Sequence, residues 1–266
     1  TLSSSSAASD VYKRQLYTCI INAVVGGLLL LYGRGAENKM SRRDGYCVVT
    51  LSWVFFTFFG MLPFYFSGSI DTITNAFFET MSGFTTTGAT ILDDIESLSH
   101  GMLFWRSLTQ WIGGLGIVFF TIAILPIFTT GGVQLFSAES TGVTHDRTHP
   151  KINVMAKWLW TIYLVLTVSE TVLLMFGGMS LFDAICQSFA TTATGGYSTK
   201  QNSISYWNSP YIEYVVAIFM IVSSINFSLF LMCLKGKVGR LFKDEELHWF
   251  LASVGTVSYT HLRAHE

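Results

Sequence analysis

The stretch Ser82-Gly83-Phe84-Thr85-Thr86-Thr87-Gly88-Ala89-Thr90 is rich in threonine and glycine and lies between two long hydrophobic segments. A similar stretch, Thr191-Thr192-Ala193-Thr194-Gly195-Gly196-Tyr197-Ser198, occupies the same kind of position further along the chain. Stretches of this composition are too polar for lipid and too short for domain linkers. Non-helical backbone at membrane depth is tolerated only where protein buries it or where it lines a watery cavity. We therefore predict that both stretches line an ion pathway.

The composition of the chain predicts a membrane protein. Half of its 266 residues are hydrophobic and only 12% are charged, whereas a soluble domain carries roughly 25% charged residues. Three uncharged segments each exceed the ~20 residues that cross a bilayer as a helix, namely residues 46–66, 107–130 and 214–234. Residues 158–182 are interrupted only by Glu170, and residues 16–32 form a shorter apolar run. We expect an all-α polytopic membrane protein.

The two ends of the sequence differ from the rest. Residues 1–15 begin with a serine-rich, low-complexity run, and residues 257–266 are equally unlike the apolar sequence before them. We expect both segments to be non-native extensions, and we expect the native fold to comprise residues 16–254.

The distribution of Lys and Arg predicts the orientation in the membrane. Basic residues concentrate in three segments, 33–45, 131–157 and 235–243, and are sparse in the segments between them. Cytoplasmic loops of membrane proteins carry such an excess. The two Thr/Gly stretches are then expected to open to the outside.

The chain overlays itself when it is shifted by 108 residues. Thr86 then meets Thr194, Gly88 meets Gly196, and the flanking apolar segments coincide. We expect two tandem units, residues 45–130 and 151–235, each made of a helix, a short re-entrant helix, a Thr/Gly loop and a second helix. Both units begin and end on the cytoplasmic side, so the two copies are expected to be parallel.

The short helix of each unit suits a cation site. Residues 72–82 would form a helix of ~16 Å, about half of the ~30 Å hydrocarbon core. Such a half-helix directs the negative end of its dipole toward mid-membrane. Carbonyl and hydroxyl oxygens of the following loop can replace the hydration shell of an ion. Glycine at positions 88 and 196 allows backbone conformations that would align those carbonyls.

Other readings of the polar and small residues stay open. The Thr/Gly stretches could serve only close helix packing, as small residues do in membranes. Gly113, Gly114 and Gly116 favour close helix approach or a hinge. Asn226 either wets the cavity below the loops or bonds to a neighbouring helix, and Glu170 is either a structural residue or a functional one. The sequence contains no nucleophile elbow, phosphate-cradling loop or metal-ligand spacing, so we predict no enzyme activity.

Residues 75–90, Asn-Ala-Phe-Phe-Glu-Thr-Met-Ser-Gly-Phe-Thr-Thr-Thr-Gly-Ala-Thr, resemble the first filter of the bacterial Trk-type potassium transporters. The segments 105–116 and 132–139 are similar to the helix and cytoplasmic loop that follow it there. Residues 182–184 and 193–199 resemble the second filter. The resemblance covers residues 16–254 and places the chain in the Trk/Ktr/HKT superfamily.

The resemblance implies a fold with four helix–P-loop–helix units around one pore, preceded by extra helices. Residues 16–32 would then be an extra N-terminal transmembrane helix, 45–130 and 151–235 the first two units, and 243–254 the start of a third. The ion-coordinating positions would fall on Thr86, Thr87, Thr194 and Gly195, with Gly88 and Gly196 as filter glycines. The supporting pore residues would be Thr85, Ala89, Ala193, Tyr197 and Asn226.

The function implied is potassium uptake across the bacterial inner membrane, with K⁺ as the transported ion and no covalent cofactor. The resemblance also implies a homodimer of the full-length protein in lipid and a cytosolic nucleotide-binding regulatory subunit. No basic block suggests a nucleic-acid partner. Two alternatives remain: a Na⁺-permeable or Na⁺-coupled relative, and a non-transporting membrane scaffold.

Overall fold

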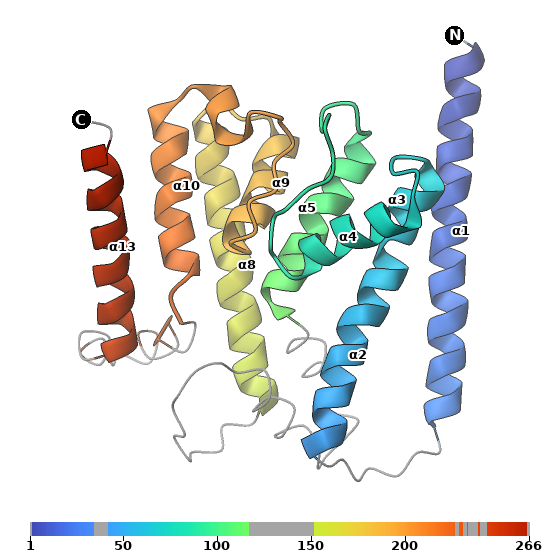
Figure 1. Ribbon diagram of the computed structural model, residues 1–266, viewed down its shortest axis with the longest axis horizontal. Coiled ribbons are helices and arrows are strands. Elements are labelled where there is room, and N and C mark those ends of the chain that lie inside the picture. Colours follow the sequence, from blue (N-terminus) through green and yellow to red (C-terminus); the bar gives the residue numbers. More distant parts are fainter. Residues whose placement is uncertain are drawn as a thin grey trace.

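The computed structural model describes residues 2–34, 42–116, 152–226 and 244–264, together with Leu229, Phe230, Cys233 and Gly239. Every regular element in these ranges is helical. Long helices stand side by side, and shorter helices lie between them (Figure 1). The predicted all-α fold is confirmed for this part of the chain.

The described residues up to Gly116 form five helices: α1 (Leu2–Gly33), α2 (Arg42–Gly60), α3 (Leu62–Ser67), α4 (Ile73–Phe84) and α5 (His100–Gly114). The apolar segment 46–66, predicted as one span, is divided at Met61 between α2 and α3. Pro63 explains the break, because proline lacks the N–H of a continuous helix and is tolerated only in a first turn. It lies in the first turn of α3.

The second half contains α8 (Ile152–Phe176), α9 (Leu181–Thr192), the 3₁₀ helix η2 (Ser203–Trp207), α10 (Pro210–Ser223) and α13 (Glu245–Ala264). Helix α9 packs against α8, α10 and also α5, so it joins the two halves. Each half has a small apolar core. One contains Phe64, Ala76 and Met102, and the other contains Leu174, Ala184 and Ile212.

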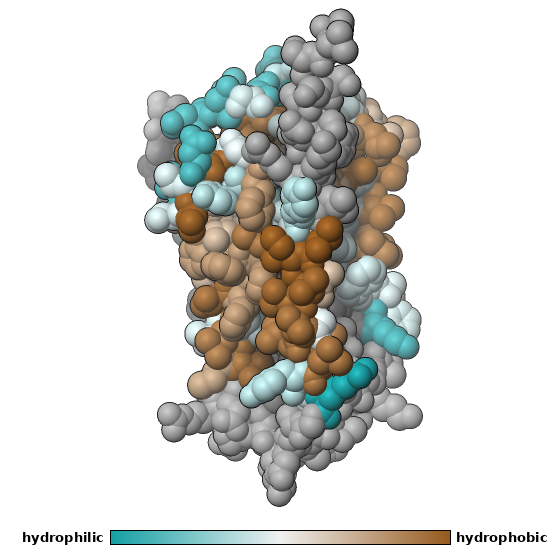
Figure 2. All heavy atoms as spheres, turned by 90° about the vertical axis from the view of Figure 1, so that its right-hand side faces the viewer, coloured by the Kyte–Doolittle hydropathy of each residue, from teal (hydrophilic) through white to brown (hydrophobic). Residues whose placement is uncertain are grey.

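The surface is apolar where long helices face outward, and the interior contains polar side chains. Exposed apolar residues include Leu30 at 74% and Phe176 at 80% of their maximum exposure, whereas Glu79 and Glu170 are completely or almost completely buried. Figure 2 shows apolar side chains at mid-height on the face that α1 forms, with polar residues above and below. This distribution suits a lipid environment, where ionisable groups face the bundle interior.

Within the part of the chain that the structure describes, two helical stretches are long and apolar enough to cross a membrane, Thr50–Ser67 and Lys157–Phe176. Tyr17–Gly33 and Pro210–Ser223 are shorter apolar helices. Much of the predicted span 107–130, and most of the basic segments 33–45, 131–157 and 235–243, lie outside the described residues or at their edges. The backbone of residues 2–15 continues helix α1, and that of residues 257–264 continues α13. Whether these end segments are non-native stays a prediction.

Candidate functional site

A twelve-residue helix precedes each Thr/Gly loop. Helix α4 begins after Thr72, whose hydroxyl accepts the N–H of Asn75, and α9 begins after Ser180, whose hydroxyl accepts the N–H of Asp183. Hydroxyl residues are favoured at this position because they satisfy an otherwise unpaired N–H of the first turn. Twelve residues span about 18 Å, and both helices are short beside the long helices around them (Figure 1).

The two loops turn in the same way. In the first loop Thr86 N–H donates to Gly83 O and Thr87 N–H to Ser82 O, at 3.0 and 2.9 Å. The second loop repeats this pattern 108 residues later: Thr194 N–H donates to Thr191 O and Gly195 N–H to Ala190 O, both at 2.8 Å. The local backbone of the loops is therefore set by the same pair of hydrogen bonds.

Matching residues of the two loops also adopt left-handed backbone conformations. Thr86 and Thr194 both have φ of 53°, and Gly88 and Gly196 have φ of 78° and 84°. A threonine in this region is unusual because its side chain is β-branched. Such conformations persist only where the surrounding structure imposes them, and they cluster at functional sites. The 108-residue shift of the sequence on itself pairs the same four residues.

The loop carbonyls are available to a ligand. Among the described residues, no hydrogen bond reaches the carbonyl oxygens of Thr86, Thr87 and Gly88 or those of Thr194, Gly195 and Gly196. The next carbonyl of the first loop differs, because Ala89 O accepts the hydroxyls of Ser82 and Tyr197 at 2.6 and 3.3 Å. Because its carbonyl is already bonded, Ala89 supports the loop. The six unpaired carbonyl oxygens are hard donors of the kind that suits an alkali cation.

The two loops approach each other closely. A Cβ atom added to Gly88 would collide with the carbonyl oxygen of Gly195. A side chain at position 88 would therefore displace one of the unpaired carbonyls of the second loop. This contact gives Gly88 a second reason to be glycine, in addition to its left-handed φ.

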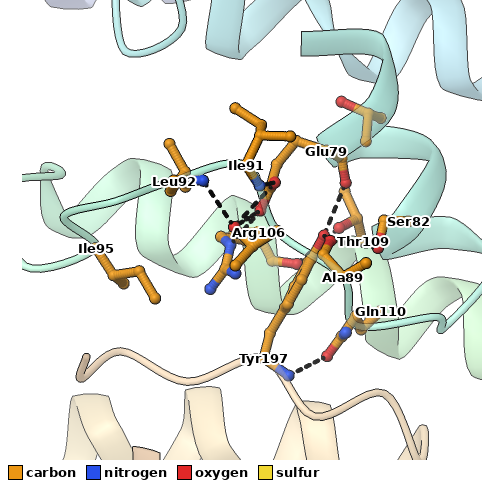
Figure 3. A network of polar contacts seen from close by, with 12 residues as sticks. Glu79, Ser82, Ala89, Ile91, Leu92, Ile95, Arg106, Thr109, Gln110 and Tyr197 are labelled. Atoms are coloured by element: carbon orange, nitrogen blue, oxygen red, sulfur yellow. Dashed lines mark hydrogen bonds and ion pairs between the residues drawn. The ribbon is translucent and has the colours of Figure 1, made fainter. Parts of the chain in front are cut away.

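Behind the loops lies a buried polar network (Figure 3). Glu79 on α4 forms an ion pair with Arg106 on α5, with 2.7 Å between Oε1 and Nε. Thr90 Oγ1 and Ile91 N–H also donate to the Glu79 carboxylate, at 2.9 to 3.0 Å. The carboxylate thus ties the end of the first loop to both helices.

The same network extends to the second loop. Arg106 Nη1 donates to Ser198 O at 3.1 Å, and its guanidinium lies 3.6 Å from the centre of the Tyr197 ring. Tyr197 Oη donates to Glu79 O at 2.9 Å, and Tyr197 N–H donates to Gln110 Oε1 at 3.0 Å. Tyr197, predicted as a supporting pore residue, is therefore a junction between the two loops.

The glycines of α5 allow close helix approach, one of the two roles expected for them. A Cβ on Gly113 would collide with the backbone of Phe84, where α4 ends. A Cβ on Gly114 would lie 2.7 Å from Ala193 Cα and 2.6 Å from Tyr163 Oη. Helix α5 thus presses against the carboxyl ends of both half-helices.

The other predicted residues lie at various distances from this centre. Thr85 caps α4, and its hydroxyl contacts Met81 O and Thr87 Oγ1 at 2.7 and 2.8 Å. Asn226 Nδ2 donates to Glu246 at 3.3 Å, so its role below the loops stays a prediction. Glu170 is completely buried on α8, where one oxygen accepts the hydroxyl of Thr192 at 3.4 Å.

Glu79, Arg106 and Gln110 are residues of this site that the sequence motifs did not indicate. The sequence does contain a signal for the Glu79–Arg106 ion pair, because a negative charge on a short apolar helix and a positive charge just before the next apolar segment need each other as partners. Buried charges need a partner, and Glu79 and Arg106 are the two charged residues of α4 and α5.

Half-length helices that end in loops with unpaired carbonyls, enclosed by apolar helices, are features of membrane proteins that conduct cations. Comparison with known families agrees with this class. Residues 12–257 match the family model TrkH, described as cation transport protein. The chain therefore belongs to the TrkH family of cation transport proteins, a family of transporters and not of enzymes, and the resemblance seen in its sequence is confirmed.

Several characterised relatives carry a common description. The chain is 43% identical over 237 residues to the Trk system potassium uptake protein TrkH of Escherichia coli K12, covering 88% of this chain and 49% of the relative. It is 38% identical to the protein of the same name from Halomonas elongata, covering 87% and 48%. It is 34% identical to TrkG of Escherichia coli K12, covering 88% and 49%.

The fold is likewise similar to a solved structure. The crystal structure of the potassium transporter TrkH from Vibrio parahaemolyticus superimposes with a TM-score of 0.76 at 33% identity, covering 91% of this chain and 49% of that one. The chain thus spans about half the length of the curated relatives that it matches.

Proposed function

We propose that this chain is part of a pore-forming subunit that takes potassium into the bacterial cell through a filter of backbone carbonyls. The observation that carries the proposal is the pair of matched loops, with three unpaired carbonyls on each. The names of the relatives, which are potassium uptake proteins, agree with K⁺ as the ion.

The filter that we propose draws on both loops. Thr86 and Thr87 of the first loop and Thr194 and Gly195 of the second coordinate K⁺, and Gly88 and Gly196 are the filter glycines. The oxygens replace the hydration shell of the ion, and the carboxyl ends of α4 and α9 add the negative ends of two helix dipoles. No covalent chemistry takes part.

Two loops make an incomplete ring, so the proposal includes further units. Residues 45–130 and 151–235 are two of four helix–P-loop–helix units, and residues 243–254 begin the third. The remaining loops belong to the half of the relatives' length that this chain does not span. The open side of Gly196 and Thr194, which are both exposed, is where those loops would lie.

The setting that we propose is the bacterial inner membrane, with several passes and the basic segments in the cytoplasm. The exposed apolar faces of α1 and α8 suit contact with lipid. The full-length protein would form a homodimer and bind a cytosolic nucleotide-binding subunit, as the family resemblance implies.

A test uses the full-length protein in bacteria that lack their own K⁺ uptake systems. Wild-type protein should support Rb⁺ uptake that K⁺ inhibits and that Na⁺ inhibits far less. Gly88→Ser should weaken the preference for Rb⁺ over Na⁺. Equal inhibition by Na⁺ would favour the Na⁺-permeable alternative, absence of uptake by a correctly inserted protein would favour a scaffold, and unchanged selectivity in Gly88→Ser would contradict the filter assignment.

A further inference from the structure

Two side chains of α5 hold the backbone of the second loop from behind. Arg106 and Gln110 are four residues apart, so they lie on the same face of the helix, and they are 2% and 0% exposed. Arg106 donates to Ser198 O at 3.1 Å, and Gln110 accepts the N–H of Tyr197 at 3.0 Å. Adjacent residues of one loop are thus bound to the helix that follows the other loop, and Figure 3 shows the bond between Gln110 and Tyr197.

The orientation of the Gln110 amide is fixed by chemistry. The backbone N–H of Tyr197 can only donate, so the atom that faces it must be the amide oxygen. The amide nitrogen then points elsewhere, and it has no hydrogen-bond partner among the described residues although it is buried. Burying a donor without a partner is unfavourable. If the position only had to be filled by a packed side chain, an apolar residue of the same size would avoid this cost.

The Gln110 amide lies directly against the filter backbone. A Cβ added to Gly195 would lie 2.6 Å from both Nε2 and Oε1 of Gln110. On its other side Gly195 directs its carbonyl at Gly88, where a Cβ would collide with it. The three residues therefore form a row, in which the Gln110 amide backs Gly195 and Gly195 abuts Gly88.

We propose that Gln110 is a positioning residue that sets the place of the Gly195 carbonyl relative to the first loop, and thereby the preference among alkali cations. The proposal rests on the filter function proposed above. A shorter or apolar side chain at position 110 would release the Tyr197 N–H and let the second loop retreat toward α5. The oxygens would then fit a dehydrated K⁺ less closely.

The chain offers a matched control in Gln187 on α9. This second glutamine is also buried, at 5% exposure, and its amide oxygen also lacks a partner among the described residues. Its amide nitrogen donates at 3.4 Å to the hydroxyl of Thr191 in the same helix, and not to the backbone of a loop. Loss of Gln187 therefore removes a buried amide without releasing a filter residue.

The experiment compares Gln110→Met and Gln187→Met in the full-length protein, in bacteria without other K⁺ uptake systems. Methionine keeps the length of the side chain and removes its hydrogen bonds. The measurement is the Na⁺ concentration that halves Rb⁺ uptake, divided by the corresponding K⁺ concentration. Gln110→Met should lower this ratio about threefold to tenfold, the range expected for loss of one hydrogen bond, and Gln187→Met should leave it unchanged. Thermal midpoints in detergent report folding separately.

Gln110→Asn provides a second variant that keeps the amide but shortens its reach, and it should also lower the ratio. A wild-type ratio in a folded Gln110 variant would overturn the proposal, as would an equal fall in Gln187→Met. Failure of both Gln110 variants to accumulate would assign the residue to folding and also overturn it. Absence of Rb⁺ uptake by the unsubstituted protein would instead overturn the proposed function.

Discussion

Glu79 Oε1 and Arg106 Nε lie 2.7 Å apart, and the two side chains are 0% and 2% exposed. The pair joins the first half-helix to the helix after its loop, and Arg106 continues to the backbone of the second loop. Buried ions are retained only where hydrogen bonds satisfy them on several sides. Here the Glu79 carboxylate also accepts hydrogen bonds from the Thr90 hydroxyl and the Ile91 N–H. The backbones of both loops are therefore held by one charge pair.

Removal of one partner of this pair should strongly destabilise the protein. Arg106→Met leaves the Glu79 carboxylate buried without its counter-charge, which typically costs about 3–5 kcal/mol in the free energy of unfolding. We expect a large fall in the thermal midpoint of the purified full-length protein in detergent. The ion pair Lys200–Glu96 is the control, because it is 3.6 Å long and its side chains are 22% and 43% exposed. Lys200→Met should cost less than about 1 kcal/mol, and equal shifts in the two variants would contradict the prediction.

Gly88→Ala should have two effects: it strains the backbone at position 88, and it also displaces part of the filter. The new Cβ would displace the Gly195 carbonyl as well as adopt an unfavourable φ of +78°. Gly68 has a similar φ of +72° but open space around its Cβ position. Gly68→Ala therefore measures the conformational cost alone, about 1–3 kcal/mol. We expect the preference for Rb⁺ over Na⁺ to fall in Gly88→Ala and to stay at the wild-type level in Gly68→Ala. An equal fall in both variants would show that the contact with the Gly195 carbonyl is not the cause.

Local features of the site could be predicted from the sequence, whereas its long-range contacts could not. Composition and the 108-residue shift located both half-helices and paired Gly88 with Gly196, because helix length, caps and turns depend on nearby residues. The bonds from Arg106 to Ser198 and from Gln110 to Tyr197 join residues about ninety positions apart. No periodicity in a single sequence carries such pairings. Hydrophobicity alone also did not show that helices α2 and α3 meet at Met61 within the predicted span 46–66, a subdivision that Pro63 explains.

Gly113→Ala should separate α5 from the end of α4. Its Cβ would collide with the backbone of Phe84, which cannot rotate away as a side chain could. Overpacking of this kind typically costs about 1–3 kcal/mol. Gly26→Ala on α1 meets nothing within 4 Å, and alanine is the better helix former. We expect a lower thermal midpoint for Gly113→Ala and an equal or higher one for Gly26→Ala, and a tolerated Gly113→Ala would contradict the close approach.

Tyr197→Phe should weaken the junction between the loops without removing the ring that lies over Arg106. The hydroxyl donates to Glu79 O and also approaches Ala89 O, so its loss should cost about 1 kcal/mol and lower the thermal midpoint. Tyr206 is 51% exposed, and its ring likewise lies near a cation, Lys200. Tyr206→Phe is thus the matched control and should leave the midpoint unchanged. If the two variants behaved alike, the hydroxyl of Tyr197 would have no part in the junction.

Glu170→Gln should leave Rb⁺ uptake unchanged, although Glu170 is a completely buried carboxyl group. One of its oxygens accepts a long hydrogen bond from Thr192, the other has no partner among the described residues, and no cation pairs with the carboxyl group there. An amide has the same shape and can still accept from Thr192, so the substitution removes little. Glu79→Gln is the same chemical change at a carboxylate that is ion-paired and triply hydrogen-bonded, and it should lower stability and uptake. Loss of uptake in Glu170→Gln with a normal thermal midpoint would instead give that carboxyl group a direct part in transport.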